Sequence, residues 1–215
     1  MNKLISKRIF TSFILLFILI LMVSFDLFST YILIVFSVLS VIEFLNITNK
    51  IFFKSFIKFL INLIFIFYLL IFCILFFYFS NFIQLKIILY FLIFTCAASD
   101  IGGFVFGKFL KGPKLTKISP NKTYAGAIGS LISSSLVIYF FIIYLKINFS
   151  YSFLIIGIGT SIACQIGDLL FSYLKRKARI KDTGSILPGH GGILDRLDGI
   201  LFGLPIGFIL LKLIG

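Results

Sequence analysis

The feature that most constrains the fold of this chain is its series of long apolar segments. They fill most of the 215 residues, and each is near the roughly 20 residues that a membrane-spanning helix needs. They cover residues 9–25, 28–45, 59–79, 85–98, 124–145, 151–171 and 199–214. No alternation with a period of two runs through them, which argues against a membrane β-barrel and leaves the α-helix to satisfy the backbone in lipid. We therefore predict an all-α, polytopic membrane protein with about seven transmembrane helices.

The basic residues indicate the orientation of these helices. The net charge is +13, which in a soluble protein would suggest a nucleic-acid partner. With a cytoplasmic N-terminus and seven crossings, all of the 20 lysines and arginines except Lys86, Lys146 and Lys212 fall on the cytoplasmic side. We therefore interpret the charge as membrane topology and attraction to anionic headgroups, expect no nucleic-acid partner, and place the chain in a bacterial-type cytoplasmic membrane.

The acidic residues divide the chain into two parts. Residues 1–98 contain only two of the seven acidic residues, and we predict that they form a scaffold of four transmembrane helices. The other five lie between residues 100 and 198. We predict that residues 99–215 form a catalytic domain of three helices and two cytoplasmic loops, with the active site on the cytoplasmic side.

Glu43 is an acidic residue inside the second apolar segment. A carboxylate within a membrane span usually marks a pathway or a partnered site. A basic turn follows closely at Lys50 and Lys54, so the side chain could instead reach water. We favour this second interpretation.

Three aspartates form a candidate metal site. Asp168 is near the end of the sixth apolar segment, while Asp195 and Asp198 share one face at the start of the last helix. Carboxylates from two helices are suitable ligands for Mg²⁺, which keeps further positions for water and phosphate oxygens. The structural alternative is that Asp195 and Asp198 cap their helix and pair with Arg196 or the basic loop.

The second cytoplasmic loop contains three glycines in the five residues Pro188–Gly192. Glycines permit unusual dihedral angles and let backbone N–H groups approach a phosphate chain. With Lys181, Asp182 and the acidic pair nearby, the segment has the parts that a polyphosphate site requires. His190 could donate to a phosphate, serve as an acid or simply be solvated. The basic run 175–181 could equally anchor the loop to the membrane surface.

The first cytoplasmic loop is predicted to run from Ser99 to Tyr124, and it begins with the acidic, glycine-rich segment 99–103. Thr123 is a suitable N-cap for the fifth helix. Capping does not account for Ser119 and Lys122 beside it.

Both loops resemble the signature of the phosphatidate cytidylyltransferases, the CDP-diacylglycerol synthases. In the second loop the resemblance is carried by Ser172, Leu174, Lys175, Arg176, Lys181, Asp182, Gly184, Pro188, Gly189, His190, Gly191, Gly192, Ile193, Asp195, Arg196 and Asp198. In the first it is carried by Ser99, Asp100, Gly107, Lys108, Ser119, Pro120, Lys122 and Thr123. One departure is Tyr124-Ala125-Gly126, where the family usually has Trp-Glu-Gly.

The resemblance implies transfer of the cytidylyl group from CTP to phosphatidic acid within the lipid bilayer, with Mg²⁺ as cofactor. Apart from the resemblance, we leave open a second cation near Asp198. A homodimer is a further expectation. The metal ligands would be Asp168 and Asp195. The expected catalytic residues are Lys175, Arg176, Lys181, Asp182, His190, Arg196 and Asp198. The expected substrate-binding residues are Asp100, Ser119, Lys122, Thr123, Gly189, Gly191 and Gly192.

Two other functions remain open at this point. A CTP-dependent kinase acting on a membrane alcohol would use the same polyphosphate-binding parts, but it would need a base for its hydroxyl acceptor. A transporter would be expected to place charged residues at mid-membrane depth and often in repeated halves. The acidic residues of this chain mostly gather at one face, which disfavours transport.

Overall fold

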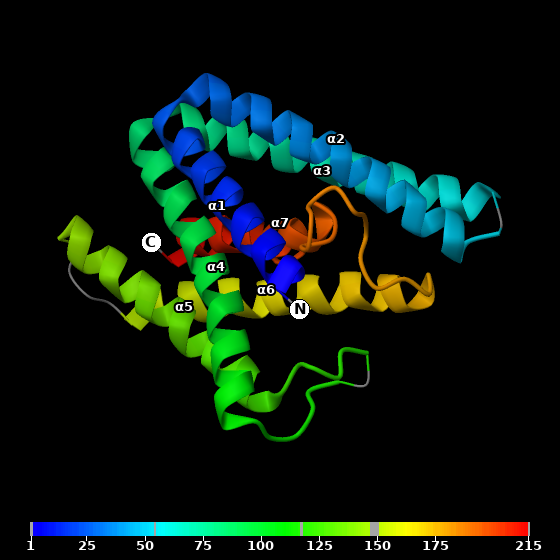
Figure 1. The fold of residues 1–215 in the computed structure, drawn as a ribbon. Coiled ribbons are helices and arrows are strands. Elements are labelled where there is room, and N and C mark those ends of the chain that lie inside the picture. The colour runs from blue at the N-terminus through cyan, green and yellow to red at the C-terminus, as the bar shows by residue number, and fades with distance from the viewer. Residues whose placement is uncertain (1, 54, 117, 147–150, 215) are drawn as a thin grey trace. The chain divides into compact units, whose positions relative to one another are not determined.

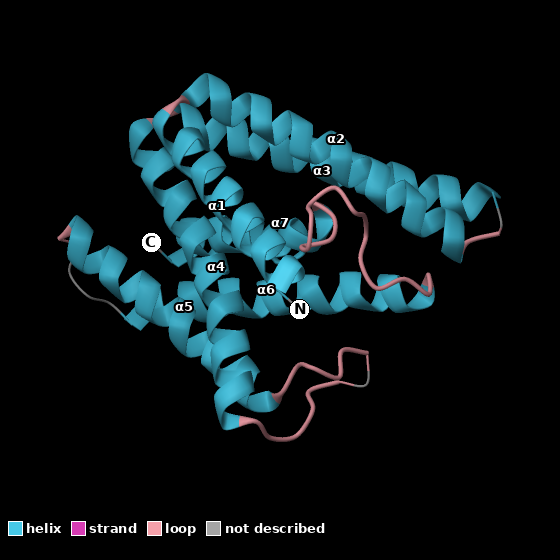
Figure 2. Cartoon of the chain, in the orientation of Figure 1, coloured by secondary structure: helices cyan, strands magenta, loops and turns pink. Residues whose placement is uncertain are grey.

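A computed structural model describes residues 2–53, 55–116, 118–146 and 151–214 of the chain. Within these residues seven α-helices follow one another, and the only β-structure is two isolated bridges (Figures 1 and 2). The helices are α1 (Asn2–Ser24), α2 (Asp26–Ile51), α3 (Ser55–Asn81), α4 (Ile83–Leu110), α5 (Tyr124–Leu145), α6 (Tyr151–Lys177) and α7 (Leu194–Ile214). The prediction of an all-α fold is confirmed.

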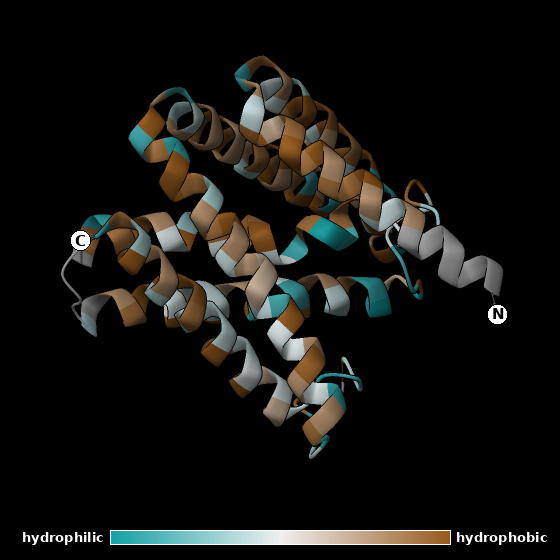
Figure 3. Ribbon diagram, turned by 60° about the vertical axis from the view of Figure 1, so that its left-hand side comes forward, coloured by the Kyte–Doolittle hydropathy of each residue, from teal (hydrophilic) through white to brown (hydrophobic). Residues whose placement is uncertain are grey.

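Five helices are long and apolar enough to cross a membrane. They are α2, α3, α4, α5 and the Phe153–Lys177 part of α6. In Figure 3 brown, the apolar colour, recurs along the helical ribbons among paler residues and a few teal ones. In the described residues α1 contributes the shorter apolar stretch Phe10–Ser24, and α7 is not among the five. The chain is therefore a multi-pass membrane protein, whereas seven crossings and a cytoplasmic N-terminus stay predictions.

The first predicted loop is shorter than expected. Residues 99–108 were predicted to be loop, but α4 continues through them to Leu110, so this part of the prediction is wrong. The connection to α5 is made by residues 111–123 alone. Thr123 does cap α5 as predicted, because its side chain accepts a hydrogen bond from the Gly126 N–H at 3.1 Å.

Close packing of α4 against α5 explains why glycines occur in this helical segment. A Cβ atom at Gly102 would lie 2.6 Å from the Gly129 carbonyl oxygen, and one at Gly126 would lie 2.7 Å from the Gly103 carbonyl oxygen. Small residues let two membrane helices approach closely enough for such backbone contact. The glycines that resembled a loop signal in the sequence are therefore packing residues.

Gly102→Ala is expected to destabilise the protein although alanine is the better helix former. Overpacking typically costs about 1–3 kcal/mol, which exceeds the roughly 0.5–1 kcal/mol that alanine contributes in a helix. The measurement is the thermal unfolding midpoint in detergent micelles. Ala97→Val, which adds carbon atoms at an exposed position of α4, is the control and should leave the midpoint nearly unchanged. An equal or higher midpoint for Gly102→Ala would disprove close α4–α5 packing.

The chain divides into two compact units. The first combines Met1–Lys86 with Leu174–Leu197, and the second combines Ile87–Tyr173 with Asp198–Gly215. In the first unit α2 packs along α3 and α1 packs on α2. The functional division into a scaffold of residues 1–98 and a catalytic domain of residues 99–215 stays a prediction.

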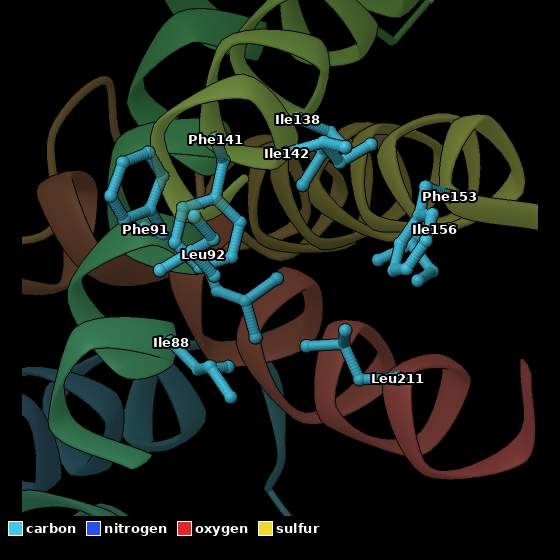
Figure 4. Close-up of a pocket in the computed structure, with 10 residues that line it drawn as sticks. Ile88, Phe91, Leu92, Ile138, Phe141, Ile142, Phe153, Ile156 and Leu211 are labelled. Carbon is cyan, nitrogen blue, oxygen red and sulfur yellow. The ribbon is translucent and has the colours of Figure 1, made fainter. Parts of the chain in front are cut away.

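The second unit contains an apolar pocket of about 80 Å³, shown in Figure 4. Its walls come from α4, α5, α6 and α7. The lining residues are Ile88, Phe91, Leu92, Ile138, Phe141, Ile142, Leu145, Phe153, Ile156 and Leu211. Because all of these side chains are hydrocarbon, the pocket offers no group that could bind a phosphate.

Candidate active site

Residues 178–193 connect α6 to α7 and belong to the first unit. Within this connection, residues 187–191 form a tight turn that contains two glycines. The Leu187 N–H donates to the Gly191 carbonyl and the His190 N–H donates to the Leu187 carbonyl, both at 2.9 Å. Gly189 and Gly191 have φ of 82° and 84°, a region that side-chain-bearing residues rarely adopt. The prediction that glycines permit unusual dihedral angles here is confirmed.

Asp195 lies in the first turn of α7, where three N–H donors surround its carboxylate. Oδ2 accepts the Thr183 N–H at 2.8 Å and the Gly192 N–H at 3.0 Å, and the Thr183 hydroxyl oxygen lies 3.0 Å from it. Oδ1 accepts the Lys175 ammonium at 2.6 Å, and the Asp195 side chain is only 6% exposed. Pairing with the basic segment, the structural alternative for this residue, is thus present, although the partner is Lys175 and not Arg196.

The ionisation of Asp195 follows from these contacts. Burial alone would raise the pKa of its carboxyl group. The hydrogen bonds from Lys175, Gly192 and Thr183 outweigh burial and hold the pKa below its usual value. Asp195 is therefore an anion at neutral pH, as a cation ligand must be.

A pocket of about 750 Å³ opens beside the glycine turn. It is lined by Lys181, Asp182, Gly184, Ser185, Leu187, Pro188, Gly189, His190, Gly191 and Arg196. Six of the predicted site residues are thus brought to one cavity of the first unit. Arg176 is exposed in the last turn of α6 and is not among the lining residues.

Arg196 and His190 hold the turn in place. The Arg196 guanidinium donates to the His190 carbonyl oxygen through Nη2 at 2.8 Å and through Nε at 3.3 Å. The His190 ring bonds through Nδ1 to the hydroxyl of Thr11 in α1. His190 is therefore half-buried and anchored to α1 rather than simply solvated, and its role as a phosphate donor or an acid stays a prediction.

The second unit brings together another set of predicted residues. Lys122 donates to Asp168 Oδ2 at 2.9 Å, and both side chains are partly buried. Asp168 faces α7, because a Cβ at Gly199 would lie 3.3 Å from its Oδ1. Asp198 is buried at the same place, and its Oδ1 accepts the Gly199 N–H at 3.0 Å. Lys122, Asp168 and Asp198 thus lie near one another in the second unit, where its share of α7 begins at Asp198.

The remaining predicted residues of the first loop differ in setting. Ser119 is half-buried, and its carbonyl oxygen accepts the Lys122 N–H at 3.0 Å in a turn. Asp100 is exposed on α4, whereas the preceding Ser99 is buried and bonds to the Ser161 hydroxyl at 2.7 Å. Ser99 therefore links α4 to α6 within the second unit.

The interpretation of Glu43 as a side chain that reaches water is wrong. Glu43 is only 2% exposed. Its carboxylate accepts hydrogen bonds from the Thr183 hydroxyl at 2.6 Å and from the N–H groups of Ile193 and Leu194 at 3.0 and 2.9 Å. These donors replace water, so the carboxylate stays buried at the N-terminus of α7. Its position inside an apolar segment was the one sequence signal for a partner, whereas nothing in the sequence pointed to Thr183.

Two lysines accompany the carboxylates that were predicted to bind metal. Asp195 pairs with Lys175 in the first unit, and Asp168 pairs with Lys122 in the second. The described residues contain no group of three His, Cys, Asp or Glu side chains that is close enough to hold a metal ion. A Mg²⁺ site at Asp168 and Asp195 therefore stays a prediction.

The fold and these residues define a class of protein: a multi-pass helical membrane protein with a basic, glycine-rich loop beside an open pocket. A comparison with protein families names the family. The chain belongs to the cytidylyltransferase family, whose family model matches residues 2–214.

Individual relatives carry a more specific name. The chain is 46% identical over 115 residues to the phosphatidate cytidylyltransferase of Staphylococcus saprophyticus, 47% identical over 117 residues to that of Helicobacter pylori, and 42% identical over 118 residues to that of Bacillus subtilis. These alignments cover 53%, 52% and 54% of this chain. They span 44%, 42% and 44% of the relatives, so the chain matches less than half of their length.

Proposed function

We propose that this chain is a phosphatidate cytidylyltransferase, which makes CDP-diacylglycerol and pyrophosphate from CTP and phosphatidic acid. The observation that carries the proposal is the pocket of the first unit, where Lys181, Arg196 and the bare backbone of the Gly189–Gly191 turn surround a space of about 750 Å³. Membership of the cytidylyltransferase family and the names of the relatives support the same reaction.

The reaction needs little acid–base catalysis from the protein. A phosphate oxygen of phosphatidic acid forms a bond to the α-phosphorus of CTP, and the bond from that phosphorus to the β-phosphate oxygen breaks. The attacking phosphate is already an anion near neutral pH, so no strong base is needed. Positioning of the two phosphates and neutralisation of their charge then account for most of the catalysis.

We assign the triphosphate of CTP to the first unit. Lys181 and Arg196 supply positive charge at the pocket, and the glycines of the turn let a phosphate chain approach the backbone closely. Lys175 and Arg176 in the last turn of α6 add further positive charge. We assign the phosphate of phosphatidic acid to Ser119, Lys122 and Thr123 of the second unit, where Lys122 lies in a half-buried setting.

Mg²⁺ is part of the proposal, with Asp195 and Asp168 as its ligands. The chemistry of these residues fits, because Asp195 is an anion whose Oδ1 already faces a cation, the Lys175 ammonium. The ion would neutralise charge on the phosphates during transfer. We further propose a cytoplasmic N-terminus in a bacterial-type inner membrane, and a homodimer.

The test is a transfer assay in detergent-solubilised membranes with phosphatidic acid and Mg²⁺. CTP labelled at the α-phosphate is expected to label the lipid, and the product should be CDP-diacylglycerol. CTP labelled at the γ-phosphate is the matched control, because it would label lipid only if the protein were a CTP-dependent kinase. Folded wild-type protein that leaves the lipid unlabelled from α-labelled CTP would refute the proposed reaction.

A further inference from the structure

Glu43 is a buried carboxylate to which neither the family resemblance nor the proposed reaction assigns a role. It lies in α2, more than 130 positions before the residues that it contacts. The partners are Thr183 and Ile193 of the loop that carries the proposed CTP site and Leu194 at the start of α7, and all three are buried. We propose that Glu43 is a positioning residue that holds this loop and the start of α7 in the shape that binds CTP, an inference that rests on the proposed function.

The contacts of Glu43 require a carboxylate. Three donors point at its two oxygens: Oε1 accepts the Ile193 N–H, and Oε2 accepts the Leu194 N–H and the Thr183 hydroxyl. The two N–H groups belong to the N-terminus of α7, where a negative charge is favourable. A glutamine has one acceptor oxygen, so its NH₂ group would face at least one of these donors.

The loop is shaped around the Glu43 carboxylate. A Cβ at Gly184 would lie 2.6 Å from Glu43 Oε1, and one at Gly192 would lie 2.5 Å from the same atom. Any larger residue at either position would displace the carboxylate. Gly192 was predicted from the sequence to contact substrate. The contact with Glu43 gives a structural reason why this position is a glycine.

Thr183 connects Glu43 to Asp195. Its hydroxyl oxygen is 2.6 Å from Glu43 Oε2 and 3.0 Å from Asp195 Oδ2. A hydroxyl has one proton, so it donates to one carboxylate at a time, and the shorter contact favours Glu43. The Thr183 N–H then remains for Asp195, to which it donates at 2.8 Å. Glu43 orients Thr183, and Thr183 orients the proposed metal ligand.

Burial separates this role from catalysis. With 2% exposure, Glu43 has no surface through which it could touch CTP in this structure. Its effect must pass through the geometry of the loop. A defect in that geometry should weaken CTP binding and leave the affinity for phosphatidic acid unchanged, because the proposed lipid-phosphate residues belong to the other unit.

The first part of the test is kinetic. Glu43→Gln is expected to raise the KM for CTP about tenfold, in line with lost hydrogen bonds to a charged group, while the KM for phosphatidic acid changes less than about twofold. Simple misfolding would lower the amount of active enzyme and leave both KM values unchanged, and that result would overturn the proposal. Ser40→Ala, one turn away in α2, is the matched control, because in the described structure its buried hydroxyl has no hydrogen-bond partner.

A second pair of variants tests whether Thr183 connects Glu43 to Asp195, and it leaves the buried charge of Glu43 unchanged. Thr183→Val removes the hydroxyl and should raise the KM for CTP about threefold to fivefold, whereas Thr183→Ser keeps the hydroxyl and should behave like the wild type. Combined with Glu43→Gln, Thr183→Val should add little, because both changes break one chain of contacts. Fully additive effects would overturn the role of Thr183 as the connection.

Hydrogen exchange tests the same inference without any activity. In Glu43→Gln, the amides of residues 183–197 are expected to exchange faster than in the wild type, while those of α5 remain unchanged. If the wild type labels no lipid, the proposed reaction fails, and exchange still decides whether Glu43 holds the loop. Unchanged exchange over residues 183–197 would overturn the inference whatever the reaction is.

Discussion

Asp195→Asn is expected to lower kcat/KM for cytidylyl transfer by at least about 100-fold, the loss typical of removing a preorganised electrostatic group from an active site. The change removes the negative charge that the proposed Mg²⁺ site needs. The new NH₂ group also faces donors on either side, because Lys175 approaches Oδ1 while Thr183 and Gly192 approach Oδ2. The measurement is incorporation of α-labelled CTP into lipid over a range of Mg²⁺ concentrations.

Two controls make this result specific. Asp26→Asn removes a side chain at the start of α2 that is 63% exposed and pairs with Lys86, and it should leave the rate within about twofold because neither residue belongs to the proposed site. Asp195→Asn leaves the Lys175 ammonium, 13% exposed, without its partner. The double variant with Lys175→Met removes that charge and should recover thermal stability but not transfer. Full activity of folded Asp195→Asn would refute the assignment of Asp195 to the site.

The second large effect is expected at the ion pair between Lys122 and Asp168. Lys122→Met and Asp168→Asn should each lower kcat/KM by about 100-fold, because each removes a charge that the proposal assigns to a phosphate or to Mg²⁺. Each change also leaves the opposite charge partly buried, which by itself destabilises the protein.

A charge exchange separates these two causes. The double variant Lys122→Asp with Asp168→Lys restores an ion pair between α6 and the loop before α5, and it should recover part of the thermal stability that the single variants lose. Transfer should stay low, because the charges now face the substrates in the wrong order. Recovery of both stability and transfer would mean that the pair is structural and touches no substrate.

Several local features were predictable from sequence because neighbouring residues decide them. The apolar segments predicted helices, the hydroxyl of Thr123 predicted a cap, and Pro188–Gly192 predicted a turn with unusual dihedral angles. The helices, the cap and the turn depend on backbone preferences or solvation over a few residues, which a sequence displays directly. The family was predicted differently, from the resemblance of the two polar segments to its signature.

Helix ends were less predictable, since glycine has two uses. In the segment 102–107 it permits close helix packing, while at Gly189 and Gly191 it permits a positive φ. The residue type is the same, and only the neighbouring helix distinguishes the two cases. α4 therefore continues to Leu110, past the point where the sequence predicted a loop.

The sequence by itself determined a multi-pass helical membrane protein of the cytidylyltransferase family and identified the two polar segments that carry its chemistry. The tertiary structure alone decided that Lys175 pairs with Asp195, that His190 bonds to α1, and that Glu43 is buried against the start of α7. Glu43 and Thr183 are 140 positions apart. No local pattern encodes such a contact, because a carboxylate in an apolar segment shows only that it needs a partner, and the packing of the helices supplies that partner.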